Sequence, residues 1–95
     1  MMLRVTRDAH DDLAGLRRHI VANAGAGIAD MVIDRIGTML STLAAFPHMG
    51  HDGHVSGTFE MVIPRLPFLV VYRIDFTDTE RELVVLRIYH TARYR

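Results

Sequence analysis

The spacing of hydrophobic and polar positions changes halfway along this chain. In the first half, apolar residues recur at intervals of three and four. In the second half they come in nearly continuous runs that are rich in β-branched and aromatic side chains. The first spacing is typical of amphipathic helices and the second of buried strands. The sequence therefore predicts helices first and a sheet afterwards.

Two amphipathic helices are predicted. Thr6 or Asp8 can cap the first helix, which should stop near Asn23, ahead of a glycine-rich turn. The second helix runs from about Ile28 to Ala45 and ends at Phe46-Pro47. The apolar stripe of the first helix is Ala9, Leu13, Leu16 and Ile20. Two such helices form an antiparallel hairpin, and both stripes must be buried on another element.

Four strands are predicted around the helical hairpin. One lies before it, at Leu3–Val5, and three lie after it, at Thr58–Ile63, Phe68–Phe76 and Glu82–His90. Short turns join the last three, so they should form an antiparallel meander. The predicted fold is α+β with the order β-α-α-β-β-β, in which the helical hairpin packs on one face of an antiparallel sheet. Residues 1–95 are expected to make a single domain.

The last two strands are apolar on both faces, yet only two helices are available to cover them. The second face is therefore expected to be partly bare, and a bare apolar face indicates a partner. Strand alternation places two sets of residues of the last strand on opposite faces. These sets are Val84, Leu86, Ile88 and His90 on one face, and Leu83, Val85, Arg87 and Tyr89 on the other.

Composition narrows the class of protein. The apolar fraction of 49% and the charged fraction of 23% are globular values, and the absence of cysteine excludes disulfides and thiol chemistry. No apolar run approaches the length of a bilayer span and the start carries no secretory signal, so we expect a soluble cytoplasmic protein. A net charge of zero argues against nonspecific binding of nucleic acid.

Three histidines in one loop suggest a metal site at first sight. His48, His51 and His54 surround Asp52, and imidazoles spaced in this way can reach one ion. No glutamate or cysteine accompanies them, however, and their spacing matches no known site. We therefore interpret the segment as a solvated loop and expect neither a metal nor a cofactor.

Four motifs, in this order, resemble a known family. They are Leu43-x2-Phe46-Pro47-x2-Gly50, Gly57-Thr58-Phe59-Glu60, Pro67-Phe68-Leu69-Val70-Val71-Tyr72-Arg73 and Leu86-Arg87-Ile88-Tyr89-His90-x-Ala92-Arg93. In order and spacing they resemble the RelE/ParE superfamily, the toxin half of bacterial type II toxin–antitoxin pairs. The last two motifs are more similar to the ParE branch. The chain departs from that branch at His51 and Phe59, where arginine is usual.

The resemblance implies a function and partners. A ParE-like toxin, of the kind found in plasmid-stabilisation modules, binds DNA gyrase and blocks it without an established catalytic site. A cognate antitoxin neutralises it. The resemblance to the RelE branch implies the alternative, an endoribonuclease that cleaves messenger RNA on the ribosome. The sequence thus leaves the question of an enzyme open and leans toward a binding protein.

Two sets of residues are expected to contact partners. The end of the chain carries arginines and no acid, so we expect it to meet the target through Arg87, Tyr89, Arg93, Tyr94 and Arg95. We expect the antitoxin to cover the bare face of the sheet at Phe68, Val70, Tyr72, Leu83 and Val85. A groove for a helix and a sheet edge should add to that contact.

A ribonuclease of this fold needs a base, an acid and cations for the phosphorane charge. The candidates are Glu60, Arg65, Arg73, Arg87 and His90. The chain contains no lysine, and Leu69 stands where some ribosome-dependent relatives carry a catalytic arginine. Alternatively, Arg73 and Arg87 pair with acidic residues on neighbouring strands and serve the structure.

Overall fold

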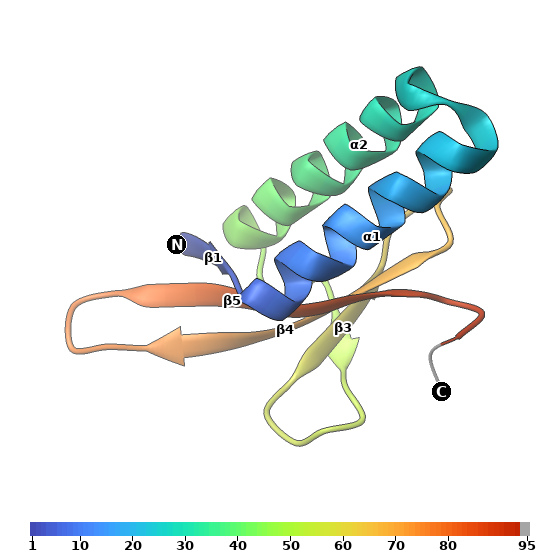
Figure 1. The fold of residues 1–95 in the computed structure, drawn as a ribbon. Coiled ribbons are helices and arrows are strands. Elements are labelled where there is room, and N and C mark those ends of the chain that lie inside the picture. The colour runs from blue at the N-terminus through green and yellow to red at the C-terminus, as the bar shows by residue number, and fades with distance from the viewer. Residues whose placement is uncertain (94–95) are drawn as a thin grey trace.

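Two helices lie across one face of a five-stranded sheet (Figure 1). The structure is a computed structural model, and it describes residues 1–93. Its elements are β1 (Met2–Val5), α1 (Arg7–Ala24), α2 (Ala26–Ala45), β2 (His51–Asp52), β3 (Phe59–Val62), β4 (Phe68–Phe76) and β5 (Arg81–His90). The predicted α+β class and element order are confirmed. The two-residue strand β2 is added within the segment predicted as a loop.

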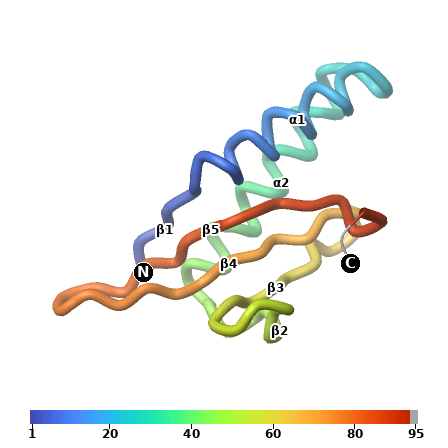
Figure 2. The backbone as a smooth tube through the Cα atoms, turned by 60° about the horizontal axis from the view of Figure 1, so that its bottom comes forward, coloured from blue at the N-terminus to red at the C-terminus, as the bar shows by residue number. Residues whose placement is uncertain are grey.

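The sheet is mixed rather than antiparallel throughout. Its strand order is β1-β5-β4-β3-β2, with the first and last strands of the chain side by side (Figure 2). β1 pairs with β5 in parallel, whereas the other neighbours are antiparallel. A tight turn fixes the direction of two strands that follow each other, but the helical hairpin separates β1 from the rest. The expectation of an antiparallel sheet is therefore wrong for β1 alone.

The helical hairpin turns on a single residue. Thr6 caps α1, and its hydroxyl accepts the N–H of Ala9 at 3.2 Å. Gly25 separates α1 from α2 with φ at 92°, a backbone conformation that glycine adopts without strain. Its N–H donates to the carbonyl of Val21 and its carbonyl accepts from Ala29. Thr6, one of the two predicted candidates, is therefore the N-cap of α1, and the predicted glycine turn separates the two helices.

The core lies between the helical hairpin and the sheet. Tyr72 is its largest fully buried side chain, and its ring stacks on Phe59 with centroids 5.5 Å apart. The remaining buried members of the cluster come from both helices, from β4 and β5, and from residue 63, which follows β3. They are Ala9, Ile36, Leu40, Leu43, Ile63, Phe68, Val70, Leu83, Val85 and Ile88.

A β-bulge in β5 changes which residues face the helices. Val71 pairs with Arg87 and Tyr72 pairs with Val85, so Leu86 has no partner on β4. Leu83 and Val85 therefore share the core face with Ile88, and Val84 lies on the other face with Arg87 and Tyr89. The face assignment from simple alternation is wrong for β5. The extra residue at the bulge exchanges the two faces of the sheet between the residues before it and the residues after it.

The other face of the sheet, which we call the open face, carries no helix of residues 1–93 (Figure 2). Val62 on β3 and Met2 on β1 are 47% and 53% exposed there. The apolar residues at its centre are nonetheless buried, with exposed fractions of 0% for Val84, 5% for Leu69 and 8% for Val71. Arginine side chains on the same face lie beside them, and the long stems of arginine cover apolar surface. The expectation of a partly bare apolar face is therefore wrong for the centre of the sheet, and exposed apolar side chains remain on β1 and β3.

Candidate partner-binding site

The five residues that we expected to bind an antitoxin form part of the core. Phe68 is 7% exposed, and the other four are completely buried. All five pack beneath the helices rather than on the open face, and Phe68 alone among them also lines a groove. The full set is Phe68, Val70, Tyr72, Leu83 and Val85.

Arg87 is clamped by a residue of α1. Its Nε donates to Oδ2 of Asp12 at 2.8 Å, and its Nη2 donates to Oδ1 at 3.0 Å. The guanidinium carbon also lies 4.8 Å from the centre of the Tyr89 ring, a cation–π distance. The carboxylate of Asp12 raises the pKa of Arg87 above its ordinary value. Arg87 thus keeps its charge, but Asp12 compensates that charge locally.

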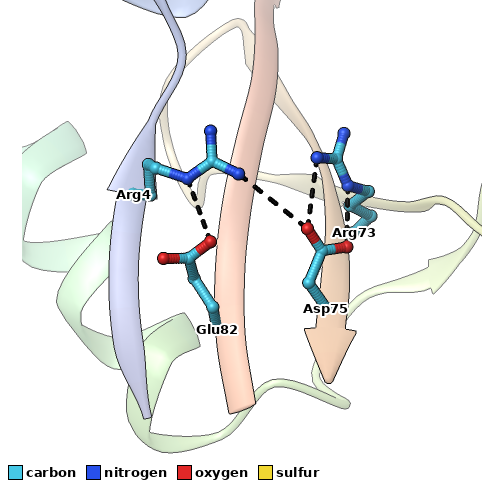
Figure 3. Close-up of polar contacts among 4 residues, drawn as sticks. All are labelled: Arg4, Arg73, Asp75 and Glu82. Carbon is cyan, nitrogen blue, oxygen red and sulfur yellow. Dashed lines mark hydrogen bonds and ion pairs between the residues drawn. The ribbon is translucent and has the colours of Figure 1, made fainter. Parts of the chain in front are cut away.

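A second charged network crosses three strands of the open face (Figure 3). Arg73 donates to Asp75 through Nε at 2.8 Å and through Nη2 at 3.2 Å. Arg4 on β1 pairs with Glu82 on β5 at 2.9 Å and reaches Asp75 on β4 at 3.9 Å. Hydrogen bonds from Arg73 lower the pKa of Asp75, so the Asp75 carboxylate stays ionised near neutral pH. Cations and carboxylates on this part of the face balance each other.

A groove runs between α1 and the end of β5. Its volume is about 900 Å³. Its floor is apolar, from Leu16 and Ile20 on α1 and from Phe68 and Ile88 on the sheet. Its polar lining residues are Asp11, Asp12, His19, Tyr89, His90 and Arg93. An apolar floor with a polar rim is the composition of a peptide-binding groove.

The candidate catalytic residues do not converge. Glu60, Arg73 and Arg87 share the open face, with Val71 between Glu60 and Arg87 in one cross-strand row. His90 pairs with Phe68 and stands on the core face, where its ring meets the Phe68 ring edge-on. The sheet therefore separates His90 from Glu60.

The remaining candidate, Arg65, lies exposed in the turn between β3 and β4 at a positive φ of 66°. Nδ1 of His90 accepts the N–H of Ala92 at 3.1 Å, which shapes the turn after β5. Glu60 is 4% exposed and accepts the N–H of His54 at 3.1 Å. Glu60 and His90 thus each have a place in the fold that needs no substrate.

The expected target-binding residues gather at one end of β5. Arg87 and Tyr89 lie on the open face, and Tyr89 and Arg93 line the groove. Tyr94 and Arg95 lie outside the described residues. Within residues 1–93, no three histidine, aspartate or glutamate side chains are placed to hold a metal ion, and no helix has the length and apolarity of a membrane span.

The role of Asp12 and the place of the groove between α1 and β5 were not predicted from the sequence, although the position of Asp12 in the helical pattern is informative. Asp12 follows Ala9 by three residues and precedes Leu16 by four, so it falls on the apolar stripe of α1. A charged residue at such a position indicates a buried partner. The identity of that partner, 75 residues away, is visible only in the structure.

Comparisons with solved structures place the fold. The toxin–antitoxin structure titled "Chromosomal ParDE TA system from P. aeruginosa" has a chain that superposes with a TM-score of 0.83 and 27% identity, over 95% of both chains. A YoeB/ParE toxin from Agrobacterium tumefaciens gives 0.66 and 19%, over 95% of this chain and 98% of that one. The RelBE2 complex from Mycobacterium tuberculosis gives 0.57 and 26%, over 94% and 95%.

The sequence comparisons agree with this placement. The model of the family described as "ParE toxin of type II toxin-antitoxin system, parDE" matches residues 3–94. The protein Y4kP of Sinorhizobium fredii is 34% identical over 62 residues, which are 65% of this chain and 59% of that protein's length.

The fold and the family model identify a toxin of the RelE/ParE superfamily, and the predicted resemblance is confirmed. More narrowly, the chain belongs to the ParE toxin family of type II toxin–antitoxin systems.

Proposed function

We propose that this toxin inhibits DNA gyrase in the bacterial cytoplasm by direct binding. The observation that carries the proposal is the pairing of two of its arginines with carboxylates. Arg73 and Arg87 are each held by a carboxylate through two hydrogen bonds. A compensated guanidinium stabilises the charge of a phosphorane poorly, but it remains a directed donor for an acceptor on a protein.

The family supports the same target. The chain matches the ParE toxin model over nearly its whole length, and members of the ParE branch are the ones that the resemblance connects with gyrase. The contact surface would be Arg87, Tyr89 and Arg93 with the last two residues of the chain. Of these, Arg87, Tyr89 and Arg93 gather at one end of β5, so a single partner can meet them together.

We propose that the cognate antitoxin occupies the groove and the edge of β1. Leu16 and Ile20 form an apolar floor, on which the apolar face of an amphipathic segment can pack. β1 is the outer strand of the sheet, and its Met2 and Leu3 are 53% and 39% exposed. An unpaired edge with apolar side chains suits the addition of a strand. Since Tyr89 and Arg93 line the groove, its occupant would also block the target surface.

A supercoiling assay tests the proposal. Purified toxin should stop gyrase from supercoiling relaxed plasmid, and Arg87→Ala should restore supercoiling while circular dichroism remains that of the folded protein. Supercoiling that is unaffected by saturating toxin refutes gyrase as the target.

The alternative is a messenger-RNA endoribonuclease on the ribosome. It is favoured by the placement of Glu60 and Arg87 in one row of the open face. Toeprinting on translating ribosomes with the same toxin preparation separates the two functions. Cleavage within the ribosomal A site that disappears in Glu60→Gln would establish the alternative.

A further inference from the structure

The side chains of Thr6, the N-cap of α1, and of Asp12 within α1 continue the edge of the sheet where β1 ends. β1 pairs with β5 only as far as Val5, opposite Val85. Beyond this point the Thr6 hydroxyl donates to the carbonyl of Leu86 at 3.0 Å. Oδ2 of Asp12 accepts the N–H of Ile88 at 2.9 Å. The backbone of β5 therefore fixes the Asp12 carboxylate at the edge, with or without Arg87.

This anchored carboxylate also orients Arg87. The two hydrogen bonds from Nε and Nη2 fix one edge of the guanidinium, and the Tyr89 ring lies against it. A guanidinium has more N–H donors than one carboxylate takes up, so the outer edge of Arg87 stays available. The Arg87 side chain is 41% exposed, whereas that of Asp12 is 16% exposed. The outer edge therefore faces solvent from a fixed support.

We propose that Asp12 is a positioning residue, which presents the outer edge of Arg87 to a carbonyl oxygen of the toxin's protein target. The Asp12–Arg87 clamp is close to neutral, and a neutral acceptor suits it better than a chain of phosphates, whose binding depends on uncompensated cations. The identity of the target rests on the proposed function, whereas the role of Asp12 in toxicity does not.

Asp12→Asn is the sharpest variant. The amide oxygen can still accept the Ile88 N–H, but the charge that holds Arg87 is gone. The ¹⁵N spectrum should show the Arg87 Nε–Hε signal protected from solvent exchange in the wild type and lost in the variant. Growth arrest on induction should need about tenfold more variant protein, as for a lost charge-assisted contact. Arg87→Lys, which keeps the charge but lacks the planar edge, should be equally weak.

Asp75→Asn is the matched control. It removes the carboxylate from the other two-bond arginine clamp of the open face, away from the groove. It should arrest growth as the wild type does. Full toxicity of Asp12→Asn with a released Arg87 signal overturns the proposal. Should Asp12→Asn fail to fold, Arg87→Lys decides, and full toxicity of that variant overturns the proposal as well.

Two further results separate the parts of the proposal. A short single-stranded RNA that shifts the Arg87 signal of the wild type overturns the carbonyl acceptor in favour of phosphate. Loss of growth arrest in Asp12→Asn, together with gyrase that the wild type leaves unaffected, would support the role of Asp12 and refute only the proposed target. A wild type that does not arrest growth overturns both.

Discussion

The hydroxyl of Tyr72 binds the carbonyl of Pro47, which lies 25 residues earlier in the chain, at 2.7 Å. The same oxygen accepts the N–H of Gly50 at 3.1 Å. One buried side chain of the central strand β4 thus fastens the start of the loop that connects α2 to β3. Burial raises the pKa of this phenol above its ordinary value, so it remains a neutral donor across the physiological range.

Tyr72→Phe should destabilise the protein by about 1–3 kcal/mol, because it leaves both Pro47 and Gly50 without their partner. Urea unfolding followed by circular dichroism measures the change. Thr42→Val is the control, since the Thr42 hydroxyl donates to Thr38 on the exposed side of α2 and its loss should change little. Equal effects of the two variants would contradict an anchoring role for Tyr72.

Gly50→Ala should destabilise the protein by about 1–3 kcal/mol through steric overlap. A Cβ atom at this position would lie 2.5 Å from the Tyr72 hydroxyl and 2.8 Å from the carbonyl oxygen of Glu60. Gly27→Ala offers a contrast within α2, where a Cβ meets nothing within 4 Å. That variant should gain about 0.5–1 kcal/mol from helix propensity. Thermal unfolding of both should shift the midpoint in opposite directions, and a shared direction would refute the packing around Gly50.

Leu40→Ala should cost about 2–5 kcal/mol, as expected for a cavity in a closed core. Leu40 is 4% exposed on the core side of α2, in agreement with the predicted stripe. Met31→Ala on the same helix is the comparison, because Met31 is 61% exposed and its loss should stay within about 0.5 kcal/mol. Chemical denaturation distinguishes them, and a cost for Leu40→Ala as small as that for Met31→Ala would show that α2 packs loosely.

The Arg73–Asp75 pair should make stability depend on pH in the acid range. Arg73 holds the pKa of Asp75 below its ordinary value of 3.8, so the folded state favours the ionised form. This contribution is fully present above about pH 5 and is lost as the pH falls through the lowered pKa of the folded state. Unfolding in urea across this range should show a shallower acid-side loss for Asp75→Asn than for the wild type. Parallel curves would mean that the pair is too exposed to matter.

Ile20→Glu should separate toxicity from neutralisation. The substitution places a charge on the apolar floor of the groove, about two helical turns along α1 from Asp12. Co-expression with the cognate antitoxin should no longer rescue growth, and antitoxin binding should weaken by about tenfold or more. His10→Glu, on the exposed side of α1, should remain neutralised. Complete rescue of the Ile20 variant would exclude the groove as the antitoxin site.

The sequence predicted those elements whose pattern repeats locally. The stripe of α1, its Thr6 cap and the long strands β4 and β5 follow from side chains within a few residues of each other. The bulge at Leu86 carries no glycine or proline to announce it, so alternation gave the wrong faces. The pairing of Arg87 with Asp12 spans most of the chain, and no local pattern contains it.

The position of β1 in the sheet affects the order in which the protein can fold. Its only described strand neighbour is β5, and residues 2–5 pair with residues 82–85. A ribosome must therefore synthesise almost the whole chain before the first strand can find its partner. Contacts this distant in sequence form late in folding. The sheet of the nascent toxin should therefore stay incomplete until β5 has been synthesised, which gives an antitoxin time to meet it.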